Sequence, residues 1–587
     1  MRMLNLGILA HVDAGKTSLT ERLLFEGGAI ARMGAVDEGS TQTDAMDLER
    51  RRGITIRSAV ATFTSGDHEI HLIDTPGHAD FIAEVERALG VLDGAILVLS
   101  AIEGVQAQTR LLMRTLKAMG LPTLLFVNKI DRPGARYESL MADIERWLSP
   151  SAISMRDPQR AAEILAEHND DVLKTYLYET ESLDADTLRE ELAAQISAAL
   201  VHPVFFGSAV TGAGIDALLQ GITDFLPTAQ GDDTAPLDGT VFAIEQDKQA
   251  VARIFSGSVT ARDIVTYSRR TSTGTIVESA KVTAVHPGHV GAGGIARLTG
   301  LRGIKVGDRL GSSSTRPEPP RFRPPTLETV VTSQNPGDLY TALSELAEQD
   351  PLINVRRDPR HHTITVSLYG EVQQEVLAAR LSEEYGVDAA FSPPRIICVE
   401  RPVGVGSAVE FMGQSPYPAT VGLRVEPSAT GNQFVLEAER GSLPRAFLTA
   451  IEETVAATLR EGLHGWQVTD CSVVLTHTGY DSPVTVAADF RIQTREVLTT
   501  ALRNARTAVC EPIDRLTLEI PAPALSSVLT ALTTSGALPD PPTLTGETYT
   551  LTALIPTAHL RAFEWQLPAL TGGTALLTTH FHTHRPR

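Results

Sequence analysis

Apolar runs alternate with helical patterns through the first 228 residues of the chain. The strands that this pattern predicts are residues 4–10, 60–64, 69–74, 94–100, 123–128 and 204–208. Strands that alternate with helices are typical of a mostly parallel sheet covered by helices on both faces. Ligands of such sheets bind at the carboxyl ends of the strands, so polar motifs at those ends are candidate sites. Residues 134–202 are interpreted as an insertion with helices at 171–179 and 184–200.

The pattern changes after residue 240, and a chain of 587 residues is too long for one hydrophobic core. The domains that it predicts after the α/β domain at 1–228 are a small antiparallel β-barrel at 240–311, a ferredoxin-like domain at 326–394, an α+β domain at 395–512 and a second ferredoxin-like domain at 513–587. Residues 228–239 and 315–325 are predicted linkers. The predicted fold is therefore multidomain, α/β and α+β.

Two helices are expected in the α+β domain, at residues 445–460 and 493–506. Three arginines, Arg495, Arg503 and Arg506, lie outside the apolar face of the second helix. As a set they are candidates for RNA phosphate contact, although a solvated surface is slightly favoured for any one of them. The net charge of −20 argues against a protein that coats nucleic acid indiscriminately, but it does not exclude one local basic contact.

Cysteine usage and hydropathy indicate the compartment. Cys398, Cys471 and Cys510 are far apart, which favours reduced core thiols over a disulfide framework or a zinc site. No charged and then apolar leader opens the chain, and its most apolar stretch, 94–102, is about half the length that spans a bilayer. We therefore expect a cytoplasmic protein that makes no membrane contact.

The strand at 4–10 leads into Ala-His-Val-Asp-Ala-Gly-Lys-Thr at residues 10–17, which matches a phosphate-binding loop with alanine in place of the usual first glycine. Lys16 would reach the β and γ phosphates, the Thr17 hydroxyl would bind Mg²⁺, and Gly15 would let the backbone approach the anion. An inert turn is the alternative for this motif alone. The predicted nucleotide contacts here are Ala10, His11, Val12, Asp13, Ala14, Gly15, Lys16, Thr17 and Ser18.

Asp-Thr-Pro-Gly-His at residues 74–78 ends the strand at 69–74. Asp74 is placed to hold Mg²⁺ through water, the Gly77 N–H to sense the γ phosphate, and His78 to orient an attacking water, although a lone histidine after a turn is more often structural. Residues 34–57 are predicted to be a switch that triphosphate orders, with the Thr55 hydroxyl closing on the metal. The predicted catalytic residues are Lys16, Thr55, Gly77 and His78, and the predicted metal ligands are Thr17, Thr55 and Asp74.

Asn-Lys-Ile-Asp at residues 128–131 follows the strand at 123–128. The Asp131 carboxylate can accept hydrogen bonds from guanine N1–H and the exocyclic amine, whereas adenine would leave it unpaired. Asn128 would brace the loop and approach N7, and the Lys129 stem would lie over the base. Backbone donors at Ser208 and Ala209 would bind guanine O6. Together these motifs in one order predict a GTPase.

Residues 1–228 resemble the G domain of translational GTPases. The sequence at 10–17, with Arg-Gly-Ile-Thr-Ile at 52–56 and Asp-Thr-Pro-Gly-His at 74–78, resembles the elongation factor G branch, in which alanine replaces the first loop glycine. The resemblance implies a further role for Asp13 beside the phosphates, with a monovalent cation.

Three loops of the α+β domain lack a regular pattern: residues 414–418, 441–444 and 480–485. With the flanking residues 465–491, the third resembles the ribosomal protection proteins that confer tetracycline resistance, and is nearest to the oxytetracycline resistance type. The resemblance implies that this loop enters the decoding region of the small ribosomal subunit and displaces the drug. The matching residues are Tyr480, Ser482, Pro483 and Val484, and Thr485 is a conservative change from the serine often found there.

That family usually continues into a short C-terminal helix that contacts the ribosome. Here residues 580–584 read His-Phe-His-Thr-His, which favours a strand edge over a metal site, and the chain ends at Arg587. Two alternatives therefore stay open, a working resistance protein and a diverged paralogue.

The resemblance implies a ribosome-dependent GTPase that dislodges tetracycline, with GTP as substrate and Mg²⁺ as cofactor. Its expected partner is the ribosome, through rRNA near the decoding site and the GTPase-activating region of the large subunit, and its expected state is a monomer. The alternatives are a translocase of the elongation factor G type and a GTP-switched ribosome-binding factor without efficient hydrolysis.

Overall fold

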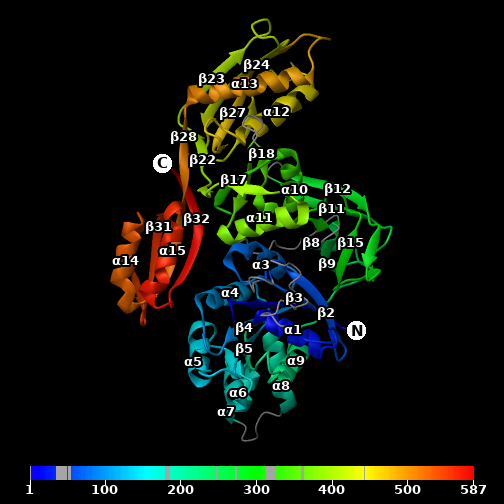
Figure 1. Ribbon diagram of the computed structural model, residues 1–587, viewed down its shortest axis with the longest axis vertical. Helices are drawn as coiled ribbons and strands as arrows, with labels where there is room; N and C mark the ends of the chain where they lie inside the picture. Colours follow the sequence, from blue (N-terminus) through cyan, green and yellow to red (C-terminus); the bar gives the residue numbers. More distant parts are fainter. Residues whose placement is uncertain are drawn as a thin grey trace. The chain divides into compact units, whose positions relative to one another are not determined.

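The computed structural model describes residues 2–34, 49, 55–178, 185–245, 248–271, 274–311, 325–357, 363–439, 441 and 443–587 (Figure 1). Most of the predicted switch and of the predicted linker at 315–325 lies outside the described residues. The chain divides into two compact units, Met1–Pro394 and Arg395–Arg587.

The N-terminal domain is built on a seven-stranded sheet in the order β2-β3-β1-β4-β5-β7-β6. The strands are β1 (Arg2–Ala10), β2 (Ala59–Ser65), β3 (His68–Asp74), β4 (Gly94–Ser100), β5 (Thr123–Asn128), β6 (Ala152–Ser154) and β7 (His202–Phe206). All neighbours are parallel except β2 and β3. The apolar pattern predicts six of these strands, but it predicts only helices in 134–202, because β6 is too short to show a period.

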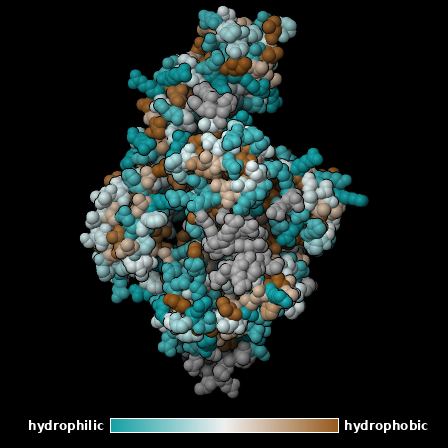
Figure 2. Space-filling model, in the orientation of Figure 1, coloured by the Kyte–Doolittle hydropathy of each residue, from teal (hydrophilic) through white to brown (hydrophobic). Residues whose placement is uncertain are grey.

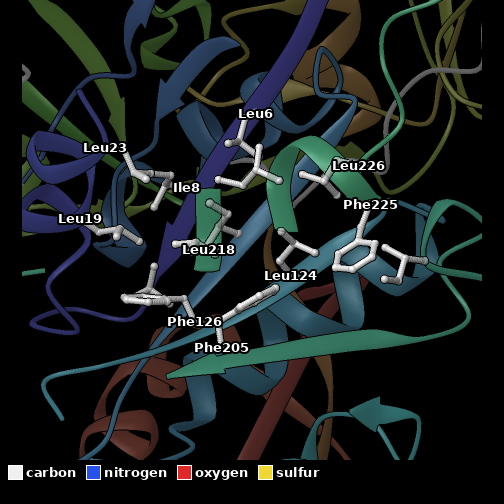
Figure 3. Packing of buried hydrophobic residues seen from close by; sticks show 14 of the residues in the cluster. Leu6, Ile8, Leu19, Leu23, Leu124, Phe126, Phe205, Leu218, Phe225 and Leu226 are labelled. Atoms are coloured by element: carbon white, nitrogen blue, oxygen red, sulfur yellow. The ribbon is translucent and has the colours of Figure 1, made fainter. Parts of the chain in front are cut away.

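Helices cover both faces of this sheet. They are α1 (Lys16–Glu26), α3 (Ile82–Leu89), α4 (Ala107–Ala118), α5 (Glu138–Trp147), α6 (Pro158–Ala166), α7 (Asp170–Tyr178), α8 (Ala185–Ser197) and α9 (Ile215–Phe225). Side chains alternate between the two faces of a strand. On one face Ile8 packs with Leu19 of α1 and Leu218 of α9 (Figure 3), whereas the next residue, Leu9, packs with Leu112 of α4 on the other face.

The second domain is a small antiparallel β-barrel. Its seven-stranded sheet contains β8 (Asp238–Ile244), β9 (Ala250–Ser256), β11 (Ile264–Thr271), β12 (Gly274–Lys281), β13 (Ala284–His286), β15 (Ile295–Thr299) and β16 (Arg309–Leu310), and β10 (Val259–Thr260) pairs with β14 (His289–Val290). Val241, Ile254 and Leu298 lie in its core. The buried Arg253 binds Asp93 of the first domain with two nitrogens, at 3.1 and 2.9 Å, and so fixes the barrel against the G domain.

The third domain has the strand and helix order of a ferredoxin-like fold. Strands β17 (Leu327–Ser333), β18 (Arg356–Arg357), β19 (Ile364–Leu368) and β20 (Ala389–Phe391) form a sheet in the order β18-β19-β17-β20. Helices α10 (Pro336–Gln349) and α11 (Glu371–Tyr385) pack on it, with Leu343 and Leu381 fully buried.

The second unit contains a four-stranded sheet in the order β23-β24-β27-β25. Its strands are β23 (Gly406–Glu410), β24 (Ala419–Pro427), β25 (Gln433–Leu436) and β27 (Cys471–Tyr480), and helices α12 (Arg445–Leu459) and α13 (Ala487–Ala505) share its core. Helix α13 begins six residues before the predicted 493. The Asp489 carboxylate accepts the Val486 N–H at 2.9 Å and closes the first turn, a cap that apolar periodicity does not reveal.

The strand β28 (Thr507–Pro521) connects this domain to the last one without a break. Its first residues pair with β22 (Val399–Pro402), and its later residues pair with β31 (Thr548–Pro556), while β32 (Leu576–Pro586) runs along most of its length. The sequence pattern predicts only its last part, 516–520, because Pro512 interrupts the apolar alternation. The structure accommodates Pro512 beside a β-bulge, where a missing N–H is tolerated.

Helices α14 (Leu525–Thr534) and α15 (Thr557–Thr571) cover the last sheet. His580, His582 and His584 lie on β32, and no group of metal-ligating side chains occurs among the described residues. The face of the molecule in Figure 2 is mostly hydrophilic with scattered apolar residues. Within the described part of the chain, no helix is long and apolar enough to cross a membrane.

Candidate functional site

The predicted phosphate-binding loop lies between β1, which ends at Ala10, and α1, which begins at Lys16. Asp13 and Gly15 adopt left-handed backbone angles, with φ of 64° and 90°. A Cβ atom on Gly15 would lie 2.3 Å from the Asn128 amide nitrogen, so both the backbone angle and the space require glycine. The loop leads directly into α1, and the N-terminus of a helix attracts anions.

The predicted metal ligands meet at the start of α1. Lys16 Nζ donates to Thr55 Oγ1 at 2.9 Å and forms a short ion pair with Asp74, while Thr17 Oγ1 lies 3.3 Å from Thr55 Oγ1. Lys16 and Asp74 are both buried. The Lys16 ammonium group thus lies among two hydroxyls and a carboxylate. These are the hard oxygen donors that Mg²⁺ prefers. The residues present therefore fit Mg²⁺.

His78 lies just beyond this cluster, on the turn after β3. Its Nδ1 accepts the Asp80 N–H at 3.1 Å, and about a third of its side chain (31%) is exposed. Gly77 lies against the phosphate-binding loop, since a Cβ atom there would be 3.4 Å from the Ala10 carbonyl oxygen. The Gly77 carbonyl oxygen accepts a hydrogen bond from the Gln108 side chain, which fixes the turn from the side of α4.

The predicted base-binding residues lie on two loops that Asn128 joins. Asn128 Nδ2 donates to the Ala14 carbonyl oxygen at 3.0 Å, and Asn128 Oδ1 accepts the Ala209 N–H at 2.9 Å. Ser208 is buried, and its hydroxyl accepts the Thr211 N–H at 3.1 Å. Asp131 is exposed, 3.9 Å from Arg132 Nε, and makes no described contact with the phosphate-binding loop.

Three residues that the motifs do not contain hold this site together. Glu103 accepts from Lys129 Nζ at 3.1 Å and lies 3.1 Å from His11 Nε2, while Thr109 Oγ1 lies 2.9 Å from His11 Nδ1. Burial lowers the pKa of His11 from its ordinary value, so its ring is neutral at pH 7. Gln108 is the third residue. No sequence signal marks these side chains, because each acts only through the neighbours that the fold brings to it.

The loop at 480–485 closes on itself at the end of β27. Thr485 N–H donates to the Asp481 carbonyl oxygen at 2.8 Å, and Thr485 Oγ1 accepts the Asp481 N–H at 2.8 Å. The Thr485 hydroxyl also bonds to the Pro418 carbonyl oxygen on the neighbouring loop. Tyr480 packs edge-on against Phe447, while Ser482, Pro483 and Val484 are exposed. Thr485 is thus the buried anchor of an exposed tip.

Family models match four parts of the chain. Residues 1–228 match the Elongation factor Tu GTP binding domain, 324–393 match Elongation Factor G domain III, 398–506 match Elongation factor G domain IV, and 508–587 match the Elongation factor G C-terminus. A crystal structure of a protein from Thermus thermophilus superimposes with a TM-score of 0.65 at 23% identity, over 100% of this chain and 97% of that one. The fold and the site therefore define a multidomain GTP-binding protein of the elongation factor G type.

Curated relatives narrow the assignment. The chain is 47% identical to the oxytetracycline resistance protein of Streptomyces rimosus, over 100% of this chain and 96% of the relative. It is 45% identical to the tetracycline resistance protein TetM of Streptomyces lividans, over 100% and 97%. The chain belongs to the ribosomal protection family of tetracycline resistance proteins, within the translational GTPases.

Proposed function

We propose that this chain hydrolyses GTP on the ribosome and uses the cycle to release tetracycline. The observation that carries the proposal is the convergence of Lys16, Thr17, Thr55 and Asp74 at the start of α1, with His78 on the adjacent turn. The names of the curated relatives support tetracycline resistance as the outcome.

The cluster around Lys16 would rearrange when nucleotide binds. Lys16 would leave Asp74 and neutralise the β and γ phosphates, because the phosphate charge outweighs that of a single carboxylate. Thr17, Thr55 and, through water, Asp74 would then hold Mg²⁺, which when bound neutralises charge that develops on the phosphate oxygens. The negative charge of the buried Asp74 carboxylate would be balanced in both states, by Lys16 before the exchange and by Mg²⁺ after it.

His78 would orient water by donating a hydrogen bond. Since its Nδ1 accepts the Asp80 N–H, a neutral ring carries its proton on Nε2. An Nε2–H group donates to a water oxygen or to the γ phosphate, and cannot also remove a proton from that water. We therefore assign His78 to positioning and charge stabilisation rather than to general base catalysis.

The exposed tip at 480–485 would carry the drug-releasing contact near the decoding site of rRNA. Pro483 restricts both its own φ and the conformation of Ser482, and Thr485 ties the base of the loop to Pro418. A tip held in this way loses little conformational entropy on binding. The G domain would meet the GTPase-activating region of the large subunit. We propose a monomer that acts in the cytoplasm, where its partner is.

The test compares GTP hydrolysis by His78→Ala and by the parent, with and without ribosomes. We expect the variant to bind GTP as the parent does and to lose about 10²- to 10⁴-fold in ribosome-stimulated turnover. His168→Ala, an exposed histidine of the same domain, is the matched control and should retain parental turnover. Unchanged turnover in His78→Ala would remove the catalytic assignment. A parent that binds ribosomes without hydrolysing GTP would be a switched binding factor, and one that moves tRNA without releasing tetracycline would be a translocase.

A further inference from the structure

Helix α11 of the third domain receives its N-terminal cap from the G domain. The residue before the helix is Gly370, which has no side chain with which to cap it. Instead Asp80 Oδ2 accepts the N–H groups of Val372 at 3.0 Å and Gln373 at 3.3 Å. These are N–H groups that the helix itself cannot satisfy, and a carboxylate there also interacts favourably with the helix dipole.

The space around this cap is matched to it. A Cβ atom on Gly370 would lie 2.2 Å from both oxygens of the Asp80 carboxylate. Gly370 has φ of −172°, an extended conformation that any residue adopts. Glycine is therefore required at this position by the approach of Asp80, and not by the backbone angle.

Asp80 is also bonded to His78, but through its backbone. The Asp80 N–H donates to His78 Nδ1 at 3.1 Å, whereas the Asp80 carboxylate stays 3.9 Å from that nitrogen, too far for a hydrogen bond. The two groups of Asp80 lie on one short helical turn, Ala79–Phe81. The Asp80 carboxylate therefore ties to α11 the same short turn whose N–H holds the imidazole.

Helix α11 also packs beside the residue that follows Thr55, the other residue expected near the γ phosphate. Val376, one turn after the cap, forms a buried cluster with Phe81 and Ile56, and Ile56 follows Thr55 directly in the chain. Elsewhere in the interface Arg87 donates to the Gln349 carbonyl oxygen at 3.1 Å and to Asp350 at 2.8 Å. The Arg87 contacts join the same two domains without touching His78.

We propose that Asp80 is a positioning residue through which α11 of the third domain holds His78 in the orientation needed for hydrolysis. The proposal rests on the role given to His78 above. It follows that docking of the third domain governs the rate of hydrolysis and leaves nucleotide affinity unchanged, since the Asp80 contacts described above join α11 to His78.

The experiment measures kcat, KM and nucleotide Kd of the full chain with ribosomes for Asp80→Ala, Asp80→Asn and Arg87→Ala. Asp80→Ala should lower kcat by about 10- to 100-fold, the loss typical of a misplaced catalytic group, with KM and Kd within about twofold of the parent. Asp80→Asn still offers an oxygen to the helix N–H groups and should retain most of the parental kcat. Arg87→Ala breaks the same interface and should lower kcat less. Unchanged Kd shows in each case that the G domain is folded.

Gly370→Ala gives an independent reading, because its Cβ atom displaces the Asp80 carboxylate. It should lower kcat in the parent and have little further effect in Asp80→Ala. The proposal would be overturned if Asp80→Ala kept the parental kcat, or if Asp80→Asn were as slow as Asp80→Ala. It would also be overturned if Arg87→Ala and Asp80→Ala lost kcat equally, or if the effects of Gly370→Ala and Asp80→Ala were additive. If His78→Ala also keeps its turnover, the role proposed above for His78 fails; if only Asp80→Ala does, the positioning role of Asp80 alone fails.

Discussion

Asn128 joins the two loops that we expect to enclose the nucleotide, so its replacement by alanine tests how far the site is preorganised. The side chain is buried, with 3% exposure, and bonds to the Ala14 carbonyl oxygen at 3.0 Å and the Ala209 N–H at 2.9 Å. Alanine removes both bonds and leaves a donor and an acceptor without these partners inside the domain.

The expected magnitude follows from those two bonds. At a net value of about 1 kcal/mol each, their loss disfavours the binding-competent arrangement by roughly 2 kcal/mol, which corresponds to roughly a 30-fold loss of apparent affinity. Asn128→Asp should fall between the parent and alanine, since its carboxylate can still accept the Ala209 N–H but cannot donate to Ala14. The matched control is Gln220→Ala, which removes an exposed hydrogen bond to Asp224 in the same domain.

The assay is titration of the ribosome-free protein with a fluorescent GDP analogue, with thermal unfolding recorded for each variant. Affinity within about twofold of the parent in Asn128→Ala would refute the reasoning, because two buried hydrogen bonds cannot be lost without a change of that size. A loss in Gln220→Ala equal to that in Asn128→Ala would show a general weakening of the domain instead.

Three further outcomes are expected. Asp131→Asn should weaken GTP binding and favour xanthine nucleotides in competition titrations, because an amide can donate to the carbonyl that xanthine presents; unchanged affinity for both would place the guanine pocket elsewhere. Glycines at 482–484 should leave ribosome-stimulated hydrolysis intact and slow the loss of radiolabelled tetracycline from ribosomes, and release at the parental rate would contradict the role of the tip. Burial lowers the pKa values of His71 and His202 to about 4 in the folded domain. Between about pH 6.5 and 4 these two histidines therefore bind protons in the unfolded chain but not in the folded domain. Stability should therefore fall as pH falls from about 6.5 to 4, and His202→Gln should lessen that decline in thermal midpoints, a parallel curve being the contrary result.

The structure brings together several of the candidate residues that the sequence singles out, because the motifs that contain them are short and contiguous. Each motif follows an apolar run, and the carboxyl ends of parallel strands meet at one edge of a sheet, so residues as distant as Lys16, Asp74 and Asn128 can be placed together without coordinates. The tip loop was recognisable for a different reason, its resemblance to a family, and neither periodicity nor spacing would have singled it out.

The contacts that connect the motifs to one another cannot be predicted from the sequence in the same way. Glu103 and Gln108 follow the fourth strand in a stretch without a motif, and their partners, Lys129 and Gly77, come from other loops. The cap of α13 by Asp489 and the passage of β28 through Pro512 depend on single hydrogen bonds and one bulge, which change element boundaries by several residues. Apolar periodicity records burial, and it carries no information about which polar group meets which.

The distribution of these connections separates binding from rate. The side chains that brace the base side, Asn128 and Glu103, find their described partners inside the G domain. By contrast, Asp80, whose N–H holds His78, caps α11 with its carboxylate. Ile56, which follows Thr55 in the chain, packs on Val376 of the same helix. A change within the third domain can reach the proposed hydrolysis site through contacts that it shares with the G domain, and two of those contacts, at Asp80 and at Ile56, lie close to His78 and Thr55 in the chain. Substitutions within α11 are therefore expected to change the rate of GTP hydrolysis on the ribosome and to leave the affinity for GTP unchanged.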